Sequence, residues 1–255
     1  MISAIVLTKN EEKNIKRCLI SLRFVDEIIV IDDMSTDSTA AIAKKMGAKV
    51  FFRSLNANFS GQRNFGLEKA KYDWILFVDA DEEVPKNLAD EILKLTDLNS
   101  RADNKINGYF LRRTDYFMGK WLKYGEIGKI RLLRLGRKNS GKWTRSVDEI
   151  WKISGRTFTT ENHLLHYPHP DLNQFLTSIN ERSALNAREF FNQGQKNTFS
   201  DWLKPFFKFC QNYFFRLGFL DGLEGFVFCL LMSLHSFLVR AKLYLLIVNN
   251  EKKSL

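Results

Sequence analysis

Acidic and polar residues stand at the ends of three short apolar segments in the first third of the chain. The segments are residues 2–8, 27–31 and 73–78. The residues concerned are Thr8, Asn10, Glu11, Asp32, Asp33, Asp79 and Asp81, with Ala80 between the last two. Two carboxylates separated by one residue can share one hard cation, which then bridges phosphate oxygens. The pattern therefore predicts a site for a nucleotide diphosphate with Mg²⁺ or Mn²⁺.

The segments that carry these residues predict an α/β fold. β-Branched runs alternate with amphipathic stretches, which is typical of a mostly parallel sheet flanked by helices. The runs are 2–8, 27–31, 48–52 and 73–78, and the amphipathic stretches begin near 11, 36, 61 and 85. The carboxyl ends of parallel strands share one edge, where such sheets bind ligands. Shorter strand-like runs at 106–165 predict antiparallel strands, and the pattern is helical from Leu172 onward.

The first predicted turn, TKNEE, contains no glycine. This excludes the GxGxxG turn of dinucleotide-binding proteins and the glycine-rich, lysine-containing loop expected of a nucleotidyltransferase, and no GxxxxGK[ST] segment occurs elsewhere. The three cysteines are widely spaced, which argues against a disulfide framework and against a CxxC-type metal site. The N-terminus has no basic segment before its apolar run, so we expect no signal peptide and a cytoplasmic chain.

The net charge of +10 is unevenly distributed along the 255 residues. Residues 101–145 hold 13 Lys or Arg against 3 Asp or Glu, so this segment contains the whole surplus. Aromatic residues are interleaved with these cations, but there is no helix-turn-helix, zinc-finger or RNP pattern, and we expect no nucleic-acid partner. Lipid headgroups or a phosphorylated glycolipid are the expected partners of this charge.

Four segments together resemble the family 2 inverting glycosyltransferases, which have the GT-A nucleotide-sugar fold. They are TKNEE at 8–12, IDDMSTDST at 31–39, GQRNFG at 61–66 and FVDADE at 77–82. The resemblance implies that the nucleotide sugar is held by Thr8, Asn10, Glu11, Asp32, Asp33, Arg63, Asp79 and Ala80. It also implies that Asp79 and Asp81 hold the metal ion.

The second half is similar to the bacterial subgroup that includes lipopolysaccharide core β-1,4-glucosyltransferases. The segments that carry this similarity are YFMGKWL, KIRLLR, Trp143…Val147-Asp148-Glu149, LLHYPHPDL and GFLDGLEGF. The subgroup usually has Val-His-Glu where this chain has Val147-Asp148-Glu149. An inverting transfer needs a carboxylate to accept the proton of the acceptor hydroxyl, and we assign that role to Glu149, with Asp148 as its rival.

Two further groups are candidates for contacts with phosphate. His166 is a candidate third metal ligand or phosphate contact, against a purely structural role. Arg131 and Arg134 are candidates to pair with the diphosphate or with an anionic acceptor, because guanidinium groups match phosphate geometry. A solvated basic face is the alternative for the two arginines.

The C-terminal part is rich in phenylalanine, with ten between Phe199 and Phe237. Residues 226–248 are apolar except for His235, Arg240 and Lys242. Only 14 of them precede Arg240, fewer than the roughly 20 that span a bilayer, which predicts a helix lying in the membrane interface. A helix packed on the catalytic domain or on a partner subunit of a homo-oligomer is the alternative, and a tilted span through residue 248 is left open.

Taken together, these features predict a GT-A catalytic domain at 1–170 and a helical region at 171–255 on the membrane surface. Residues 1–100 form the nucleotide-sugar half of that domain and 101–170 the acceptor half. The expected reaction moves a hexose from a nucleotide-diphosphate sugar, UDP-glucose first, to a glycan or glycolipid acceptor in envelope polysaccharide or lipopolysaccharide biosynthesis. The expected location is the inner face of the cell membrane. The alternative is a catalytically inactive membrane-associated module that binds nucleotide sugars or polyanions.

Overall fold

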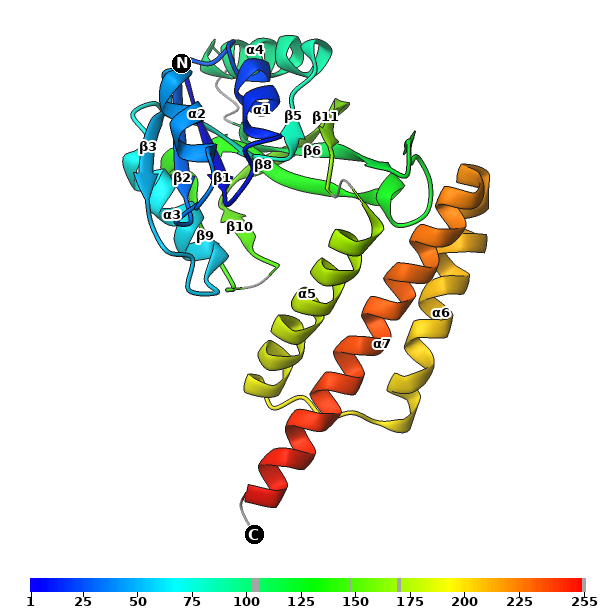
Figure 1. Ribbon diagram of the computed structural model, residues 1–255. Helices are drawn as coiled ribbons and strands as arrows, with labels where there is room; N and C mark the ends of the chain where they lie inside the picture. The colour runs from blue at the N-terminus through cyan, green and yellow to red at the C-terminus, as the bar shows by residue number, and fades with distance from the viewer. Residues whose placement is uncertain (102–105, 147, 169–170, 254–255) are drawn as a thin grey trace. The chain divides into compact units, whose positions relative to one another are not determined.

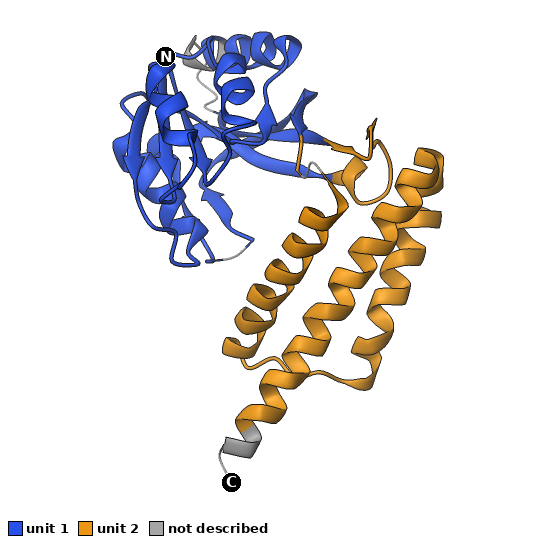
Figure 2. Cartoon of the chain, in the orientation of Figure 1, with its two compact units in different colours: residues 1–114, 130–166 blue, residues 115–129, 167–255 orange. Residues whose placement is uncertain are grey.

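The chain folds into a unit built around a β-sheet and a unit built of helices (Figures 1 and 2). The computed structural model describes residues 1–101, 106–146, 148–168 and 171–253. The sheet unit comprises residues 1–114 and 130–166, and the helical unit comprises residues 115–129 and 167–255. Val147 of the predicted Val147-Asp148-Glu149 motif, Asp103 and Lys105 of the basic segment, and His169 and Pro170 of LLHYPHPDL lie outside the described residues.

The sheet begins with four parallel strands in the order β3-β2-β1-β4. They are β1 (Ile2–Thr8), β2 (Glu27–Asp32), β3 (Lys49–Phe52) and β4 (Trp74–Asp79). The order continues through β8 (Arg131–Arg137), β6 (Ile106–Phe117), β11 (Arg156–His166) and β5 (Glu82–Glu83). The pairs β4–β8, β6–β8 and β5–β11 are antiparallel. Both the parallel first half and the antiparallel second half of the prediction are confirmed.

Helices cover both faces of the sheet, because successive residues of its buried strands point to opposite sides. Ala4 and Val6 pack in one core with α1 (Ile15–Ser21), α2 (Thr39–Lys45) and α4 (Lys86–Arg101). Ile5 and Phe77 pack in the other core with α3 (Phe59–Lys69) and a small antiparallel pair, β9 (Gly141–Thr144) and β10 (Ile150–Ile153). A short 3₁₀ turn, η2 (Lys138–Ser140), connects β8 to β9.

The sequence predicted that the first helix begins near residue 11, but in the structure it begins at Ile15. Asn10 has a left-handed φ of 53°, and its backbone N–H donates to Ser35 Oγ over 2.9 Å. The next N–H, that of Glu11, donates to Thr39 Oγ1 over 2.8 Å. These N–H groups bind the loop after β2 and the first residue of α2, so they are not available for a helix that would begin near residue 11.

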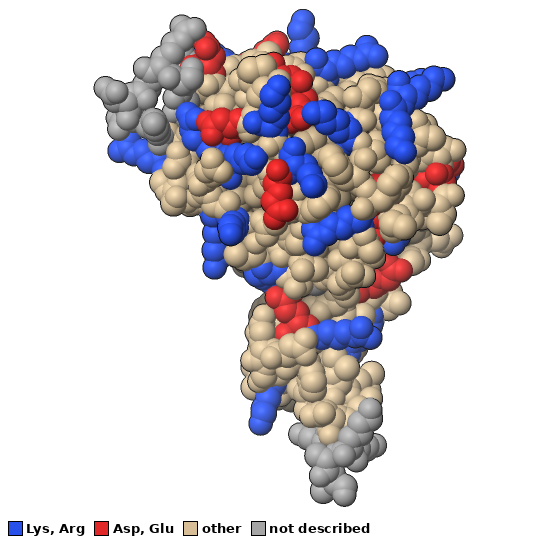
Figure 3. All heavy atoms as spheres, turned by 90° about the vertical axis from the view of Figure 1, so that its left-hand side faces the viewer, with Lys and Arg blue, Asp and Glu red and all other residues tan. Residues whose placement is uncertain are grey.

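Only part of the basic surplus lies free on the surface. Figure 3 shows Lys and Arg side chains interspersed with Asp and Glu over one face of the molecule. Arg134, however, is buried with Asp79, and Arg113 lies 3.8 Å from the buried Glu82. These two cations of segment 101–145 therefore pair with carboxylates of the sheet unit and are not available to a partner on the surface.

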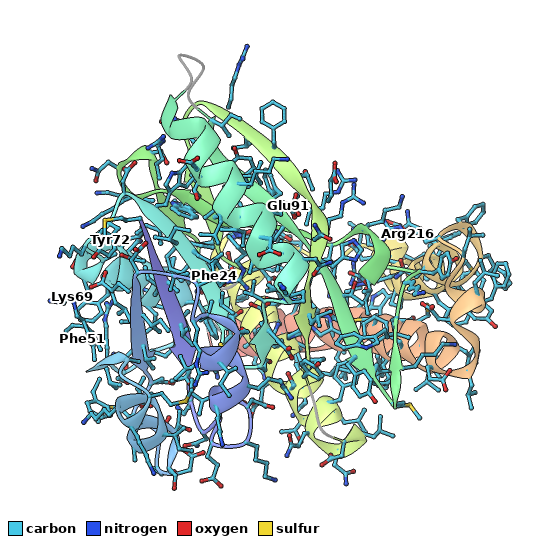
Figure 4. The ribbon with its side chains drawn as sticks, turned by 90° about the horizontal axis from the view of Figure 1, so that it is seen from above. Phe24, Phe51, Lys69, Tyr72, Glu91 and Arg216 are labelled. Carbon is cyan, nitrogen blue, oxygen red and sulfur yellow. The ribbon has the colours of Figure 1, made fainter. Side chains whose placement is uncertain are left out.

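Two contacts between layers tie the edges of the sheet unit. Glu91 of α4, labelled in Figure 4, accepts hydrogen bonds from the backbone N–H groups of Glu161 and Asn162 in β11, at 2.7 and 2.9 Å. At the β3 edge the Lys69 Nζ lies 5.6 Å from the centre of the Phe51 ring (Figure 4). The first contact fixes β11, which carries His166 at its end, against the helical layer.

The helical unit contains three principal helices, which confirms the helical pattern read from Leu172 onward. They are α5 (Leu172–Asn192), α6 (Lys204–Cys210) and α7 (Gly222–Lys253), and α7 packs against both of the others. Short turns join them: η3 (Phe199–Leu203), the π-helical η4 (Gln211–Phe215) and η5 (Gly218–Asp221). The unit also includes β7 (Lys120–Trp121), which pairs with the end of β6, and η1 (Ile127–Lys129).

The GFLDGLEGF segment connects the start of α7 to residues 123 and 124 by hydrogen bonds. The Asp221 carboxylate accepts from the backbone N–H groups of Lys123 and Tyr124, at 3.0 and 2.9 Å. A Cβ on Gly225 would lie 2.1 Å from the carbonyl oxygen of Gly218, so only glycine fits there. The segment therefore has a structural role inside the helical unit.

Candidate active site

The ends of β1, β2 and β4 lie side by side, as the sequence predicted. Thr8 is paired with Asp32 in register, and Leu7 with Asp79. The Asp32 Oδ1 accepts the Ser35 N–H over 2.6 Å. In the described part of the chain, the Asp32 Oδ2 and the Thr8 Oγ1 are buried and make no hydrogen bond. A buried polar atom without a partner is costly, which makes these two atoms candidates for contact with a polar ligand group.

The neighbouring residues shape this edge. Both carboxylate oxygens of Asp33 are engaged, by the Lys9 Nζ at 2.9 Å and by the Leu55 N–H at 2.7 Å. Asn10 is exposed, and its Oδ1 accepts the Thr36 N–H over 2.9 Å, which joins the loops after β1 and β2. Ala80 is buried, and its N–H donates to the carbonyl of Leu7.

Glu11 lies beside the acidic edge. Its Oε2 accepts from the Asn14 side chain over 2.8 Å. Burial raises the pKa of the Glu11 carboxyl, and the nearby Asp81 carboxylate raises it further.

Arg63 joins the candidate base to the strand-end carboxylate. Its side chain is 3% exposed and leaves α3 to lie 4.7 Å from the centre of the Trp143 ring. The Nε donates to Glu149 Oε1 over 2.6 Å, and Nη2 donates to Asp79 Oδ1 over 3.1 Å. Among the described residues nothing accepts a hydrogen bond from its buried Nη1. Arg63 therefore holds two carboxylates and keeps one donor for a ligand.

The structure separates the two rivals for the role of base. Glu149 is directed to Arg63 and its side chain is 14% exposed. Asp148 is exposed and has a left-handed φ of 48°. Glu149 therefore joins the cluster, whereas the exposed Asp148 makes no hydrogen bond or ion pair with the described residues of the cluster.

Arg134, a predicted phosphate-contact candidate, and Glu82, which the sequence did not mark as a site residue, complete the cluster. The Arg134 Nη2 donates to Asp79 Oδ2 over 2.6 Å and lies 3.8 Å from Glu82 Oε1. The fully buried Glu82 accepts the Asp79 N–H over 2.8 Å. Of the two arginines predicted to pair with the diphosphate or an anionic acceptor, Arg131 is exposed on β8 and Arg134 meets Asp79.

The arginines determine how these carboxyls titrate. Burial alone would raise the pKa of Asp79, but the Arg134 and Arg63 cations outweigh it and hold that pKa well below its usual range. Burial likewise opposes ionisation of Glu149, and Arg63 overcomes it and lowers the pKa of that carboxyl. For Glu82 burial prevails, and its pKa is raised. Glu149 is thus an ionised carboxylate at neutral pH.

Asp81 and His166 form a separate pair next to this cluster. The His166 Nε2 lies 3.3 Å from the Asp81 Oδ2, and both side chains are partly exposed. The end of β11 is paired with β5, where His166 stands opposite Glu82. The described residues contain no group of three or more His, Cys, Asp or Glu side chains arranged to hold a metal. One carboxylate and one imidazole fit a Mn²⁺ or Mg²⁺ whose other ligands are phosphate oxygens and water.

Comparisons with known proteins identify relatives over most of the chain. The family described as "Glycosyl transferase family 2" matches residues 3–147. An uncharacterized glycosyltransferase of Rickettsia felis is 30% identical, over 95% of this chain and 89% of its own length. The lipopolysaccharide core biosynthesis glycosyltransferase LpsC of Rhizobium meliloti is 28% identical, over 95% and 92%.

A solved structure shares the fold. The chain is similar to glucosyl-3-phosphoglycerate synthase from Mycobacterium tuberculosis, with a TM-score of 0.51 and 17% identity, covering 78% of this chain and 81% of that one. The predicted GT-A fold, a mixed sheet flanked by helices with a helical C-terminal region, is confirmed.

Proposed function

The chain belongs to glycosyl transferase family 2, and we propose that it is a metal-dependent inverting enzyme. It moves a hexose from a nucleotide-diphosphate sugar to a hydroxyl of a glycan or glycolipid, and UDP-glucose is the expected donor. The observation that carries this proposal is the convergence of Glu149, Arg63 and Asp79 beside the Asp81–His166 pair. A base, a phosphate-binding cation and a candidate metal site thus come together at one edge of the sheet.

The nucleoside binds at the ends of β1 and β2. The unpartnered Asp32 Oδ2 accepts a donor of the base or ribose, and the Thr8 hydroxyl supplies a second hydrogen bond. The free Nη1 of Arg63 donates to a phosphate oxygen. Asp81 and His166 hold the cation, which when bound neutralises charge on the diphosphate.

Glu149 acts as the general base. The acceptor oxygen bonds to the anomeric carbon, the bond from that carbon to the phosphate oxygen breaks, and the acceptor proton passes to Glu149. Arg63 fixes the orientation of this carboxylate and keeps it in the unprotonated form that a general base needs, while the lowered pKa makes it a weaker proton acceptor.

The acceptor belongs to the cell envelope. The name of the Rhizobium meliloti relative places that protein in lipopolysaccharide core biosynthesis, and it aligns with nearly the whole of this chain. We place the enzyme accordingly at the cytoplasmic face of the cell membrane. One helix in the described residues, Gly218–Asn250, is long and apolar enough to cross a membrane by length and composition alone.

The experiment measures nucleotide release from a panel of nucleotide sugars, with Mn²⁺ and an envelope glycolipid acceptor. Glu149→Gln is expected to lower turnover by at least about a hundredfold, with donor binding retained. Asp148→Asn is the matched control and keeps turnover within about threefold. Asp81→Ala is expected to abolish the effect of Mn²⁺ on donor binding, read as a thermal shift.

Two results would contradict the proposal. Equal loss in the Asp148 and Glu149 variants would remove the assigned base. Donor binding by the wild-type protein without turnover of any donor would favour an inactive nucleotide-sugar-binding module.

A further inference from the structure

The helical unit has a buried apolar interior, which includes Phe175 and Leu243, and also exposes several large aromatic side chains. Asn212, Asp221 and Ser183 are buried, whereas Phe199 is 85% exposed and Phe215 83% exposed. Soluble proteins rarely present contiguous apolar patches of more than a few hundred Å², and larger ones mark a partner or a membrane. The distribution calls for an apolar environment around the unit.

The exposed aromatic side chains gather where α6 ends and α7 begins. We define the aromatic face as Phe206, Phe207, Phe214, Phe215, Phe219, Leu220 and Leu223, all of which are exposed. Within α6 and η4 the Phe206 and Phe207 rings contact each other, with centres 5.7 Å apart, and Phe209 contacts Phe214, with centres 6.5 Å apart. The Tyr213 ring connects the face, with its centre 5.1 Å from that of Phe214 and 6.2 Å from that of Phe219.

An apolar stripe continues from this face along α7. It consists of Leu223, Phe226, Leu230, Leu234 and Phe237, at spacings of three and four residues. The side chains of α7 that turn away from the stripe, such as Cys229 and Val239, are buried within the unit. The stripe side of α7 is only partly covered: Phe226 packs on the Phe209 ring and Phe237 on the Trp202 ring, whereas Leu223 is 68% and Leu230 51% exposed.

The cations further along α7 are bound within the protein. The Arg240 Nη1 donates to the carbonyl and hydroxyl of Ser236, at 2.6 and 2.8 Å. The Lys242 Nζ donates to Asn180 Oδ1 and Ser183 Oγ of α5, at 2.7 and 2.8 Å. A helix bound in this way to a polar neighbour fits a position in the interface better than one across the bilayer.

The carboxylates beside the aromatic face are already engaged. Glu126 pairs with Lys208 at 3.1 Å and Glu224 with Lys120 at 3.8 Å, while Asp221 accepts backbone N–H groups. Arg216 (Figure 4) binds the Asn212 side chain and, like Lys123, has no carboxylate partner among the described residues. Positive charge next to exposed aromatic rings is complementary to an anionic lipid surface.

We propose that the aromatic face inserts into one leaflet of a membrane that contains anionic lipids, and that the enzyme binds there without spanning it. The inference deepens the proposed membrane location and is independent of the transfer chemistry. A second copy of the chain would cover the apolar residues as well, but it would not account for unmatched cations beside them. Interfacial helices bind in this way, with their apolar side in the boundary between the lipid headgroups and the acyl chains.

The test is cosedimentation of the full-length protein with vesicles of phosphatidylcholine containing about 30% phosphatidylglycerol. The wild-type protein is expected to sediment with the vesicles. The double variant Phe207→Ser/Phe215→Ser is expected to bind at least about tenfold more weakly, because it lacks two large apolar side chains whose transfer from water into the membrane favours binding. Phe158→Ser, which changes a phenylalanine 54% exposed on β11, is the matched control and binds like the wild type.

Two further measurements separate the outcomes. If the double variant unfolds at the same temperature as the wild type, its fold is intact. Nucleotide release with a soluble acceptor measures the transfer reaction in the absence of lipid. The proposal is overturned if the wild type stays in the supernatant or if the double variant sediments equally well. It is also overturned if the wild type is a lipid-independent dimer that the double variant dissociates, since a second copy would then cover the face.

Discussion

Replacing Arg134 by methionine removes the cation that balances the fully buried carboxylate of Glu82 and the partly exposed carboxylate of Asp79. The guanidinium lies between Asp79, at 2.6 Å, and Glu82, at 3.8 Å, and its side chain is 7% exposed. Breaking a buried ion pair from one side costs about 3–5 kcal/mol. The Asp79 side chain is 28% exposed and keeps Arg63, so we take the lower end, about 3 kcal/mol.

The pH dependence of this loss follows from the carboxyl pKa values. In the wild type Arg134 lowers the pKa of Asp79 and opposes the rise in the pKa of Glu82 that burial causes. Without it both folded-state pKa values rise. Glu82, whose pKa is raised by folding, stabilises the fold below its unfolded pKa and ceases to do so as the pH rises through the folded value. Asp79, whose pKa is lowered by folding in the wild type, contributes stability above its unfolded pKa, and part of that contribution is lost with Arg134. The destabilisation is therefore expected to be larger at about pH 8 than at about pH 5.

Thermal unfolding followed by circular dichroism at both pH values measures the effect. A loss of about 3 kcal/mol corresponds to a fall in Tm of about 6–12 °C for a unit of this size. Arg131→Met is the control, since this exposed arginine of the same strand is expected to change stability by less than about 0.5 kcal/mol. Equal effects of the two substitutions, or a loss that does not grow with pH, would refute the reasoning.

Two further substitutions test the packing that supports the site. Phe77→Ala is expected to destabilise the sheet unit by about 3–5 kcal/mol, because the fully buried ring contacts Trp143 and Trp151 with centres 5.0 and 5.2 Å away; urea unfolding measures it, and a change below about 1 kcal/mol would contradict it. Gly225→Ala is expected to lower the unfolding temperature of the helical unit, because the new methyl group meets the Gly218 carbonyl; differential scanning calorimetry measures it, and an unchanged or higher temperature would disprove this account of the motif.

Much of the fold followed from local pattern. The apolar runs around residues 2–8 and 73–78 became neighbouring parallel strands because buried strands read as continuous hydrophobic segments. The first helix was predicted about four residues too early, since the pattern could not reveal that the N–H groups of residues 10–12 bind the loop after β2. Long-range hydrogen bonds of this kind leave no periodic signal in the sequence.

The residues at the strand ends could be read from the sequence, because Asp32, Asp79 and Asp81 end or directly follow apolar runs whose strand character is a local property. Only the tertiary structure decided which side chains meet across long separations. Glu149 rather than Asp148 reaches Arg63, 86 positions away in the chain, and Arg134 rather than Arg131 reaches Asp79. The physical reason is that a left-handed turn at Asp148 and a register shift between β6 and β8 set the direction of these side chains, and neither is encoded in residue type or spacing alone.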